Sequence, residues 1–375
     1  MAPRGNGASG DGVLDLGKLE GPVLLFGGAY SNLQALEAML SVAKELRIPA
    51  KNTIHTGDVV AYCAQPRETT ELLKTSGVHC LMGNCEESIG LAKLDCGCGF
   101  PEDSKCNEYS VNWYSHVTKE LVGHDHLRHW MAALPRRIEF ETGGRRFAVL
   151  HGSARNISEF LWPSTPDDQL GASFQALPPN IDGIISGHSG IPYARVLPAA
   201  SAARRERLWV NAGVVGMPAN DGTSRGWYAA LTPAADGGEL KVSFHALSYD
   251  ARAAAEAIFA RPQLVRGYAD SLLSGIWPSH DVLPLQEQME TGIALEESTL
   301  VWCHSVASSG HEKLPQTPST GAVTPSTGTA APSTTKAATS NSQSAVLVPI
   351  AAATLAAVAV FVMMWQRGHA KRTGI

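Results

Sequence analysis

Apolar residues recur along this chain at two different spacings. Short apolar runs that end in glycines, such as residues 23–27, are typical of buried strands. The next segment, residues 33–43, has apolar positions at helical spacing, with Ser31 or Asn32 as its N-cap. Repeated alternation of this kind over residues 21–306 predicts an α/β domain with its functional groups at the carboxyl ends of strands.

The same two spacings predict the remaining elements. Gly143-Gly144 separates two strand-like runs and is typical of a hairpin. The predicted strands are residues 23–27, 52–55, 78–82, 137–141, 145–150, 181–185, 208–210, 227–231 and 241–245. The predicted helices are residues 33–43, 68–75, 108–133, 253–259 and 264–273.

Composition changes sharply after residue 306. Residues 314–344 carry a single charge, Lys336, and consist almost entirely of Thr, Ser, Pro, Ala and Gly. Such a stretch has too little apolar surface to offset the entropy that it would lose on folding. We therefore expect residues 307–344 to be a disordered linker, and we expect residues 1–20 to be disordered as well.

An uncharged apolar stretch follows the linker. As a helix, residues 345–365 would reach about 31 Å, which is enough to cross a bilayer core. Trp365 suits the membrane interface, and a basic tail of residues 366–375 comes next. The pattern predicts one C-terminal transmembrane helix that anchors the protein to a membrane in a single pass, with a buried core helix as the alternative.

The orientation of this anchor has two interpretations. Residues 1–20 contain no apolar leader, which favours a tail-anchored protein with its globular domain in the cytosol. The basic tail favours the opposite topology by the positive-inside rule, and the sequon at Asn156 is compatible with it. We favour the cytosolic placement.

Charge and cysteine content narrow the function classes. The net charge is −5 and the globular part has no basic block, so a nucleic acid is not an expected partner. Seven cysteines, an odd number spread over a long chain, do not indicate a disulfide framework. Cys96, Cys98 and Cys106 cluster in one loop, for which small-residue packing is favoured while a metal or redox role remains open.

Four short motifs place polar side chains directly after strand-like runs. The motifs are Gly57-Asp58, Gly83-Asn84, His151-Gly152 and Gly187-His188. A carboxylate, an amide oxygen and two neutral imidazoles are suitable ligands for a divalent ion such as Mn, Fe or Zn. Each side chain alone has an ordinary structural explanation, but their occurrence at four strand ends predicts one metal site. Its predicted ligands are Asp58, Asn84, His151 and His188.

In their order and spacing, these motifs resemble the calcineurin-like metallophosphoesterase family, in particular its small bacterial and archaeal phosphodiesterase branch. The resemblance covers roughly residues 21–250 and includes two longer phrases, residues 57–62 and 211–218. It implies a four-layer α-β-β-α sandwich with two metal ions at the strand ends. The carboxylate that Asp58 matches bridges the two ions in that family.

The resemblance also divides the predicted site into two halves. Where the family has the Asp and His of its first motif and its final His, this chain has Gly28, Tyr30 and Gly190. All three losses belong to one of the two metals. The ligands of the other metal and the bridging carboxylate are all present: Asn84, His151, His188 and Asp58. One metal site is therefore expected, and a second is doubtful.

Three further residues are candidates for catalysis. Cys85 stands where many relatives carry a His that protonates a leaving group. Tyr30 is a candidate ligand of a ferric ion or hydrogen-bond donor to phosphate, with space-filling as the equal alternative. Arg155 is a candidate phosphate contact, and an exposed surface arginine is equally expected. Glu86 is expected to support the ligands rather than bind the ion.

Two functions of different classes follow. The first is a membrane-anchored, metal-dependent phosphoesterase that hydrolyses a phosphomonoester or phosphodiester, and the complete ligand set favours it. The alternative is a catalytically inactive metal- or phosphate-binding regulatory module, which the altered half of the site favours. A redox role centred on Cys85 and the cysteines of residues 96–106 is a third possibility. The sequence names no substrate beyond a phosphorylated molecule.

Overall fold

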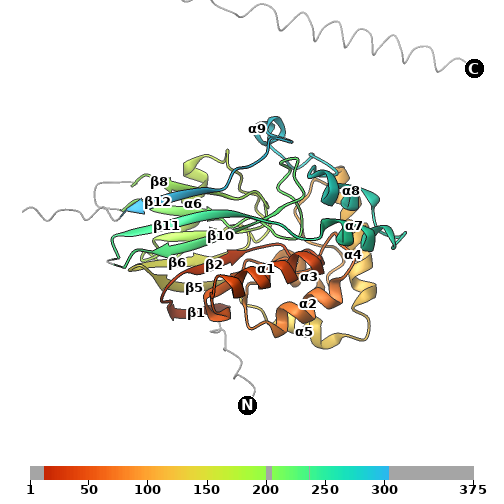
Figure 1. Cartoon of the computed structure of the whole chain (residues 1–375), viewed down its shortest axis with the longest axis horizontal. Coiled ribbons are helices and arrows are strands. Elements are labelled where there is room, and N and C mark those ends of the chain that lie inside the picture. The colour runs from red at the N-terminus through yellow and green to blue at the C-terminus, as the bar shows by residue number, and fades with distance from the viewer. Residues whose placement is uncertain (1–11, 200–204, 236, 304–375) are drawn as a thin grey trace, which may run out of the picture. The chain divides into compact units, whose positions relative to one another are not determined.

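Two six-stranded sheets form the centre of this computed structural model (Figure 1). The structure describes residues 12–199, 205–235 and 237–303. Within these residues, no helix has the length and apolar character needed to cross a membrane. The predicted linker (307–344), transmembrane helix (345–365) and basic tail (366–375) lie outside the described residues.

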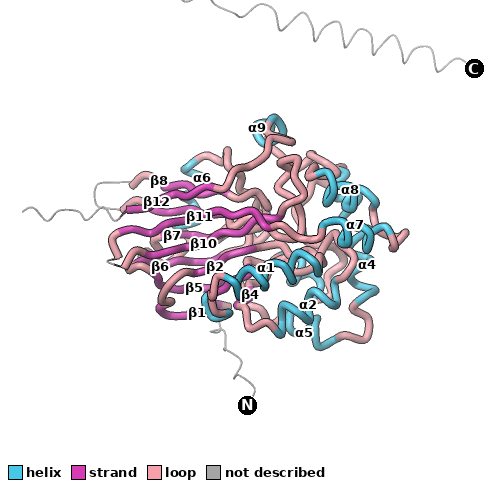
Figure 2. Tube along the Cα trace, in the orientation of Figure 1, coloured by secondary structure: helices cyan, strands magenta, loops and turns pink. Residues whose placement is uncertain are grey.

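Both sheets mix parallel and antiparallel strands, and Figure 2 draws these strands in magenta. The first sheet has the strand order β1 (Val13–Lys18), β5 (Arg137–Thr142), β6 (Arg145–Val149), β7 (Gly183–Ser186), β9 (Arg207–Asn211) and β8 (Tyr193–Leu197). The second has the order β12 (Ser298–Cys303), β11 (Glu239–Leu247), β10 (Gly226–Pro233), β2 (Val23–Phe26), β3 (Thr53–His55) and β4 (His79–Cys80).

Three apolar clusters lie between the layers of the fold and pack them together. One lies between the sheets, where Leu25 of β2 and Phe147 of β6 contribute. A second packs helices against the outer face of the second sheet, and a third packs α6 against the outer face of the first. The helices are α1 (Leu33–Glu45), α2 (Pro66–Thr75), α3 (Asn84–Gly90), α4 (Lys105–Glu120), α5 (Asp125–Ala132), α6 (Asp167–Gln175), α7 (Ala251–Phe259), α8 (Arg266–Ser274) and α9 (Leu285–Met289). This layering confirms the predicted α/β class.

The parallel strands position the predicted site. In the second sheet β2, β3 and β4 are parallel neighbours, and in the first sheet β6, β7 and β9 are parallel neighbours. The carboxyl ends of parallel neighbours meet at one edge of a sheet. The chain segments that leave β3, β4, β6 and β7 carry Asp58, Asn84, His151 and His188. Each sheet therefore contributes two of the four predicted ligands.

Two predictions about individual elements were wrong. The N-terminal segment was expected to be disordered, but Val13–Lys18 form β1, which pairs in parallel with β5. The helix predicted over residues 108–133 is two helices, α4 and α5, because Gly123 adopts a left-handed φ of 78° between them. The sequence analysis also did not predict β8, β12, α3, α6 or α9.

Other predictions are confirmed. The side chain of Asn32 accepts the Ala35 N–H as the N-cap of α1. Strands β5 and β6 form the predicted antiparallel hairpin, and Gly143 and Gly144 both have positive φ at its turn.

Candidate metal centre

The four predicted ligands converge on one nitrogen atom, Nε2 of His151. It lies 3.1 Å from Oδ2 of Asp58, 3.0 Å from Oδ1 of Asn84 and 3.1 Å from Nδ1 of His188. Asp58, His151 and His188 form a group whose ligand atoms all lie within 4.8 Å of one another. All four residues are buried. The two sheets thus bring together side chains that are up to 130 positions apart in sequence.

The protonation of His151 indicates why a cation suits this cluster. Its Nδ1 lies 2.8 Å from the carbonyl oxygen of Thr56, which can only accept a hydrogen bond. In the neutral ring Nδ1 therefore carries the hydrogen, and Nε2 presents a lone pair to the oxygens of Asp58 and Asn84. Three acceptors facing one another repel, unless a cation or an added proton lies between them. The donor set therefore fits a divalent metal ion.

The pKa shifts of Asp58 and His188 also favour metal binding by this cluster. Burial raises the pKa of Asp58, but the charge and hydrogen bond of His151, together with the charge of His188 and the contact with Cys85, lower this pKa to about 2. Burial lowers the pKa of His151, but the charge and hydrogen bond of Asp58, the hydrogen bond to Thr56 and the charge of Glu86 together raise it. Burial and the neighbouring His151 lower the pKa of His188 to about 3. At neutral pH Asp58 is thus an anion and His188 is a neutral imidazole, which are the forms that bind a metal ion.

Glu86 joins the two turns that carry Asp58 and Asn84. Its carboxylate accepts the N–H groups of Asp58 and Val59, each at 2.7 Å, and of Gly83 at 2.8 Å. Burial and the charge of Asp58 raise its pKa to about 7. The turns approach so closely that a Cβ atom on Gly83 would lie 2.3 Å from Oδ1 of Asp58. Glu86 therefore positions the ligands, in line with the role expected from the sequence.

Backbone conformation marks two of the ligands. Asp58 has a φ of 64° and His188 a φ of 62°, in the left-handed region that side chains other than glycine seldom adopt. Conformations of this kind cost free energy and are concentrated at functional sites. The N–H of Cys85 also donates to Oδ1 of Asp58 at 3.2 Å, which orients the carboxylate.

In the other half of the expected two-metal site, apolar and aromatic side chains pack around Gly28, Tyr30 and Gly190. A Cβ atom on Gly28 would lie 2.5 Å from the Tyr30 ring and 2.6 Å from Cγ1 of Val214. The Tyr30 ring packs against Tyr62, with centroids 4.8 Å apart. At Gly190 a Cβ atom would lie 3.5 Å from Cγ2 of Val214. Tyr30 and Val214 thus fill space that a side chain at position 28 would need.

An aromatic cavity opens beside the candidate metal centre. Asp58, Asn84 and His188 line it, and no Lys or Arg among the described residues does. Phe160 stacks on His188 with centroids 4.2 Å apart and on Trp162 at 5.4 Å. The aromatic residues that line the cavity are Tyr30, Tyr62, Phe100, Tyr109, Phe160, Trp162, Tyr268 and Trp277.

Motif analysis missed Phe160, Trp162 and Trp277 because none belongs to a ligand motif. The one available signal was an aromatic pair, Phe160 and Trp162, in the segment that follows His151.

Of the three catalytic candidates, the structure brings one to the cavity. Tyr30 lines it, and burial together with Asp58 raises the pKa of its phenol well above the usual range. Cys85 is buried, does not line the cavity, and burial and Asp58 raise the pKa of its thiol. Arg155 does not line it either, and its half-exposed side chain lies 3.7 Å from Glu159. The phosphate contact predicted for Arg155 thus has no support in this geometry.

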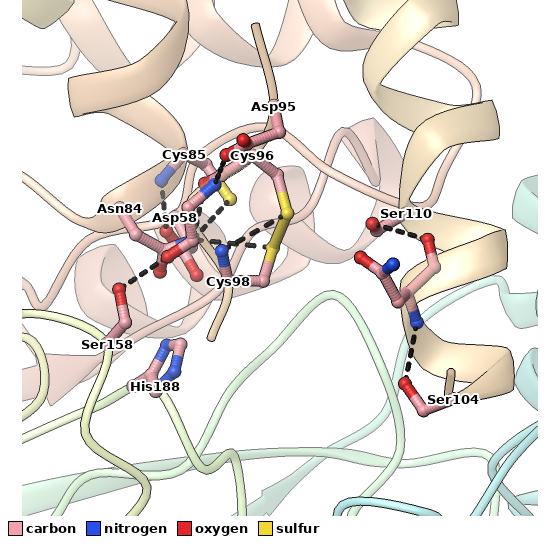
Figure 3. The surroundings of a disulfide bond; sticks show 12 residues. Asp58, Asn84, Cys85, Asp95, Cys96, Cys98, Ser104, Ser110, Ser158 and His188 are labelled. Atoms are coloured by element: carbon pink, nitrogen blue, oxygen red, sulfur yellow. Dashed lines mark hydrogen bonds between the residues drawn. A yellow bond between two sulfur atoms is a disulfide. The ribbon is translucent and has the colours of Figure 1, made fainter. Parts of the chain in front are cut away.

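The cysteine loop lies next to the candidate metal centre (Figure 3). Cys96 and Cys98 form a disulfide, whereas the sequence indicated no disulfide framework and favoured small-residue packing in this loop. Cys106 is a free cysteine that lines the cavity.

Comparison with known proteins gives consistent matches. The family model of the calcineurin-like phosphoesterase superfamily domain matches residues 29–234, more than half of the chain. An uncharacterized protein of Methanocaldococcus jannaschii, MJ0912, is 26% identical over 240 residues, which cover 61% of this chain and 88% of that protein.

Two solved structures share the fold. A metallophosphoesterase from Sphaerobacter thermophilus is 22% identical with a TM-score of 0.51, and the hypothetical protein PH1004 from Pyrococcus horikoshii is 19% identical with a TM-score of 0.54. Each match covers 68% of this chain and 99% of the other.

Proposed function

We propose that this protein, which belongs to the calcineurin-like phosphoesterase superfamily, hydrolyses phosphoric esters with one metal ion. The family is metal-dependent, and the observation that carries the proposal is the convergence of Asp58, Asn84 and His188 on Nε2 of His151. When bound there, a divalent ion supplies Lewis-acid activation of the phosphoryl group and of water.

The residues around the centre have separate tasks in this proposal. Asp58 would supply the negative charge that holds an ion, and Asn84, His151 and His188 would be its other ligands. Thr56 keeps the hydrogen of His151 on Nδ1, which leaves the lone pair of Nε2 available to an ion. Tyr30 lines the cavity as a neutral phenol and can donate a hydrogen bond to a phosphoryl oxygen.

Charge in the cavity favours a phosphodiester over a phosphomonoester. Among the described residues Asp58 is the one carboxylate that lines the cavity, and no Lys or Arg lines it. A dication and Asp58 together leave a single positive charge. A diester, which carries one negative charge, balances it, whereas a doubly charged monoester leaves an excess that no cation offsets.

The cavity walls favour a substrate with an aromatic group. Planar rings stack at the separations seen between Phe160, Trp162 and His188, and such pairs add about 0.5–1.5 kcal/mol to the burial of their area. An aryl or nucleobase group beside the phosphorus would extend this stack.

Hydrolysis assays test the proposal. Protein loaded with Mn²⁺ should hydrolyse bis(4-nitrophenyl) phosphate faster than 4-nitrophenyl phosphate, and Asp58→Asn should lose both activities. Arg155→Ala, a change outside the cavity, should retain them. Phe160→Leu should raise the KM for the diaryl ester several-fold while leaving an alkyl diester unaffected.

The regulatory module is the second candidate, and the altered half around Gly28 and Tyr30 favours it. One bound metal ion per chain without turnover of any phosphoester would support this module and contradict the enzyme.

Membrane attachment is a separate proposal. The uncharged stretch of residues 345–365 supports a single-pass anchor with the globular domain in the cytosol. Deleting residues 345–375 should release the protein from membranes with its metal content unchanged. Protease treatment of sealed organelles should digest the domain, and a protected, glycosylated Asn156 would contradict this topology.

A further inference from the structure

The Cys96–Cys98 disulfide closes a small loop directly beside the candidate metal centre (Figure 3). Both cysteines are buried, and Cys98 lines the cavity with Asp58, Asn84 and His188. The loop therefore lies where its covalent state can affect the ligands, and one of its two cysteines lines the cavity.

Asn84 connects this loop to the metal centre. Its Nδ2 donates to the carbonyl oxygen of Cys96 at 3.0 Å and lies 3.5 Å from Sγ of Cys98. Because these contacts hold the NH₂ group, the other amide atom, Oδ1, faces Nε2 of His151 at 3.0 Å. The loop thus determines which atom of Asn84 is presented to a metal ion.

A second contact links the loop to the opposite side of the centre. Ser158 Oγ donates to the carbonyl oxygen of Gly97, and the ring of Phe160, two residues later, stacks on His188. Gly97 has a φ of 61°, which favours glycine at the turn between the cysteines. The loop is therefore hydrogen-bonded to both the segment that carries Asn84 and the segment that carries Phe160.

Stabilisation of the fold is a weak explanation for this disulfide. A disulfide stabilises mainly by removing entropy from the unfolded chain, and this effect grows with the length of the closed loop. Cys96 and Cys98 are separated by a single residue, so the bond restricts the unfolded chain very little.

We propose that Cys96 and Cys98 are a redox-active pair that controls the metal affinity of the adjacent centre through Asn84. A small dithiol attacks the Cys98 sulfur from the cavity, the Cys96–Cys98 bond breaks, and each cysteine sulfur gains one proton. The reductant loses two electrons and two protons and becomes a disulfide. The opened loop no longer fixes the Asn84 amide, and metal affinity falls. This inference rests on the metal centre of the proposed function.

Metal titration of the full-length protein tests the inference without an activity assay. Mn²⁺ affinity is measured by calorimetry on oxidised protein and on protein reduced with a trialkylphosphine. The phosphine takes oxygen from water to become its oxide, and the two protons go to the cysteine sulfurs. Reduction should weaken Mn²⁺ binding about 10-fold, at the low end of the loss seen when partners that orient metal ligands are removed. Mass spectrometry after alkylation confirms which cysteines are bonded.

Two variants distinguish this pair from other cysteines. The double variant Cys96→Ser/Cys98→Ser should bind Mn²⁺ as weakly as reduced wild type and should not respond to the phosphine. Cys303→Ser removes an exposed free cysteine of β12 and should respond as wild type does.

Equal affinity of the oxidised and reduced wild-type protein would overturn the inference, as would failure of the Cys96–Cys98 bond to form under oxidising conditions. Either result would leave the proposed function intact if Mn²⁺ still binds. Absence of Mn²⁺ binding in both forms would overturn the proposed function and the redox control together.

Discussion

The two halves of the candidate site differ in whether they contain side chains that can bind a metal ion. In one half, Asp58, Asn84, His151 and His188 keep their ligand atoms within hydrogen-bond distance of a common nitrogen. In the other half, Gly28, Gly190 and the buried Tyr30 stand where the family resemblance predicts ligands of a second metal ion.

In the altered half, other side chains fill the space beside Gly28. Tyr30 lies against the position that a side chain on Gly28 would occupy, and its ring packs at a tilt against Tyr62. Dense packing of this kind makes a return to the family's ligand at position 28 unfavourable as a single substitution. The retained half shows no such filling, since its atoms still face a shared point.

Removal of a ligand from the retained half should have the largest effect. His151→Ala deletes the nitrogen on which the other ligands converge, so Mn²⁺ affinity should fall by more than the roughly 10–100-fold caused by losing an outer partner. Calorimetric titration measures the affinity. Tyr30→Phe, a change in the altered half, is the matched control and should keep Mn²⁺ affinity close to wild type. Comparable losses in both variants would contradict the division into halves.

Loss of the carboxylate that joins the ligand turns should have an intermediate effect. Glu86→Gln replaces one acceptor oxygen with an NH₂ group that faces backbone N–H donors, so Mn²⁺ affinity should fall about 10–100-fold. Glu37→Gln, on the exposed face of α1, should match wild type. An unchanged affinity in Glu86→Gln would show that the turns hold their positions without this residue.

Restoring the family residue in the altered half should destabilise the protein. Gly28→Asp places atoms against Tyr30 and Val214, so the free energy of unfolding should fall by about 1–3 kcal/mol. Urea denaturation measures it. Gly17→Asp tests the backbone alone, because Gly17 has a similar positive φ and open space around it. Adding Tyr30→His to Gly28→Asp should recover part of the loss, and no recovery would contradict the packing explanation.

The free energy of unfolding of the metal-free protein should depend on pH because of its buried imidazoles. Burial lowers the pKa of His188, and also that of His55, to about 3. As pH falls, these histidines become protonated in the unfolded chain at a higher pH than in the folded protein. The contribution of each neutral imidazole to the free energy of unfolding is therefore fully present above about pH 6.5. It is lost as pH falls toward 3, by about 1.4 kcal/mol per pH unit for each group.

Urea unfolding of the metal-free protein between about pH 7 and pH 5 measures this slope. His188→Asn should have a shallower slope than wild type. An identical slope would mean that His188 is not held neutral by the fold.

Sequence alone predicted most elements of the central sheets, because apolar runs ending in glycine are strong local signals. It also singled out Asp58, Asn84, His151 and His188, the side chains that the structure brings together, since each follows a strand-like run. The strand β1 was missed because its partly exposed residues give no buried run.

Other features depend on tertiary contacts. The contact between Tyr30 and the space at Gly28, the stack of Phe160 on His188 and the Asn84 contacts to the cysteine loop all join segments that the sequence leaves unpaired. The spacing of residues along the chain does not predict such contacts. Residues at strand ends are different, because the regular geometry of a sheet brings the carboxyl ends of parallel strands together.

The most direct test is a crystal structure of the protein grown with Mn²⁺, with anomalous scattering measured at the manganese edge. The account predicts one ion per chain, bound by Asp58, Asn84, His151 and His188, with no anomalous peak beside Tyr30. Two ions, or an ion out of reach of His151 and His188, would contradict it.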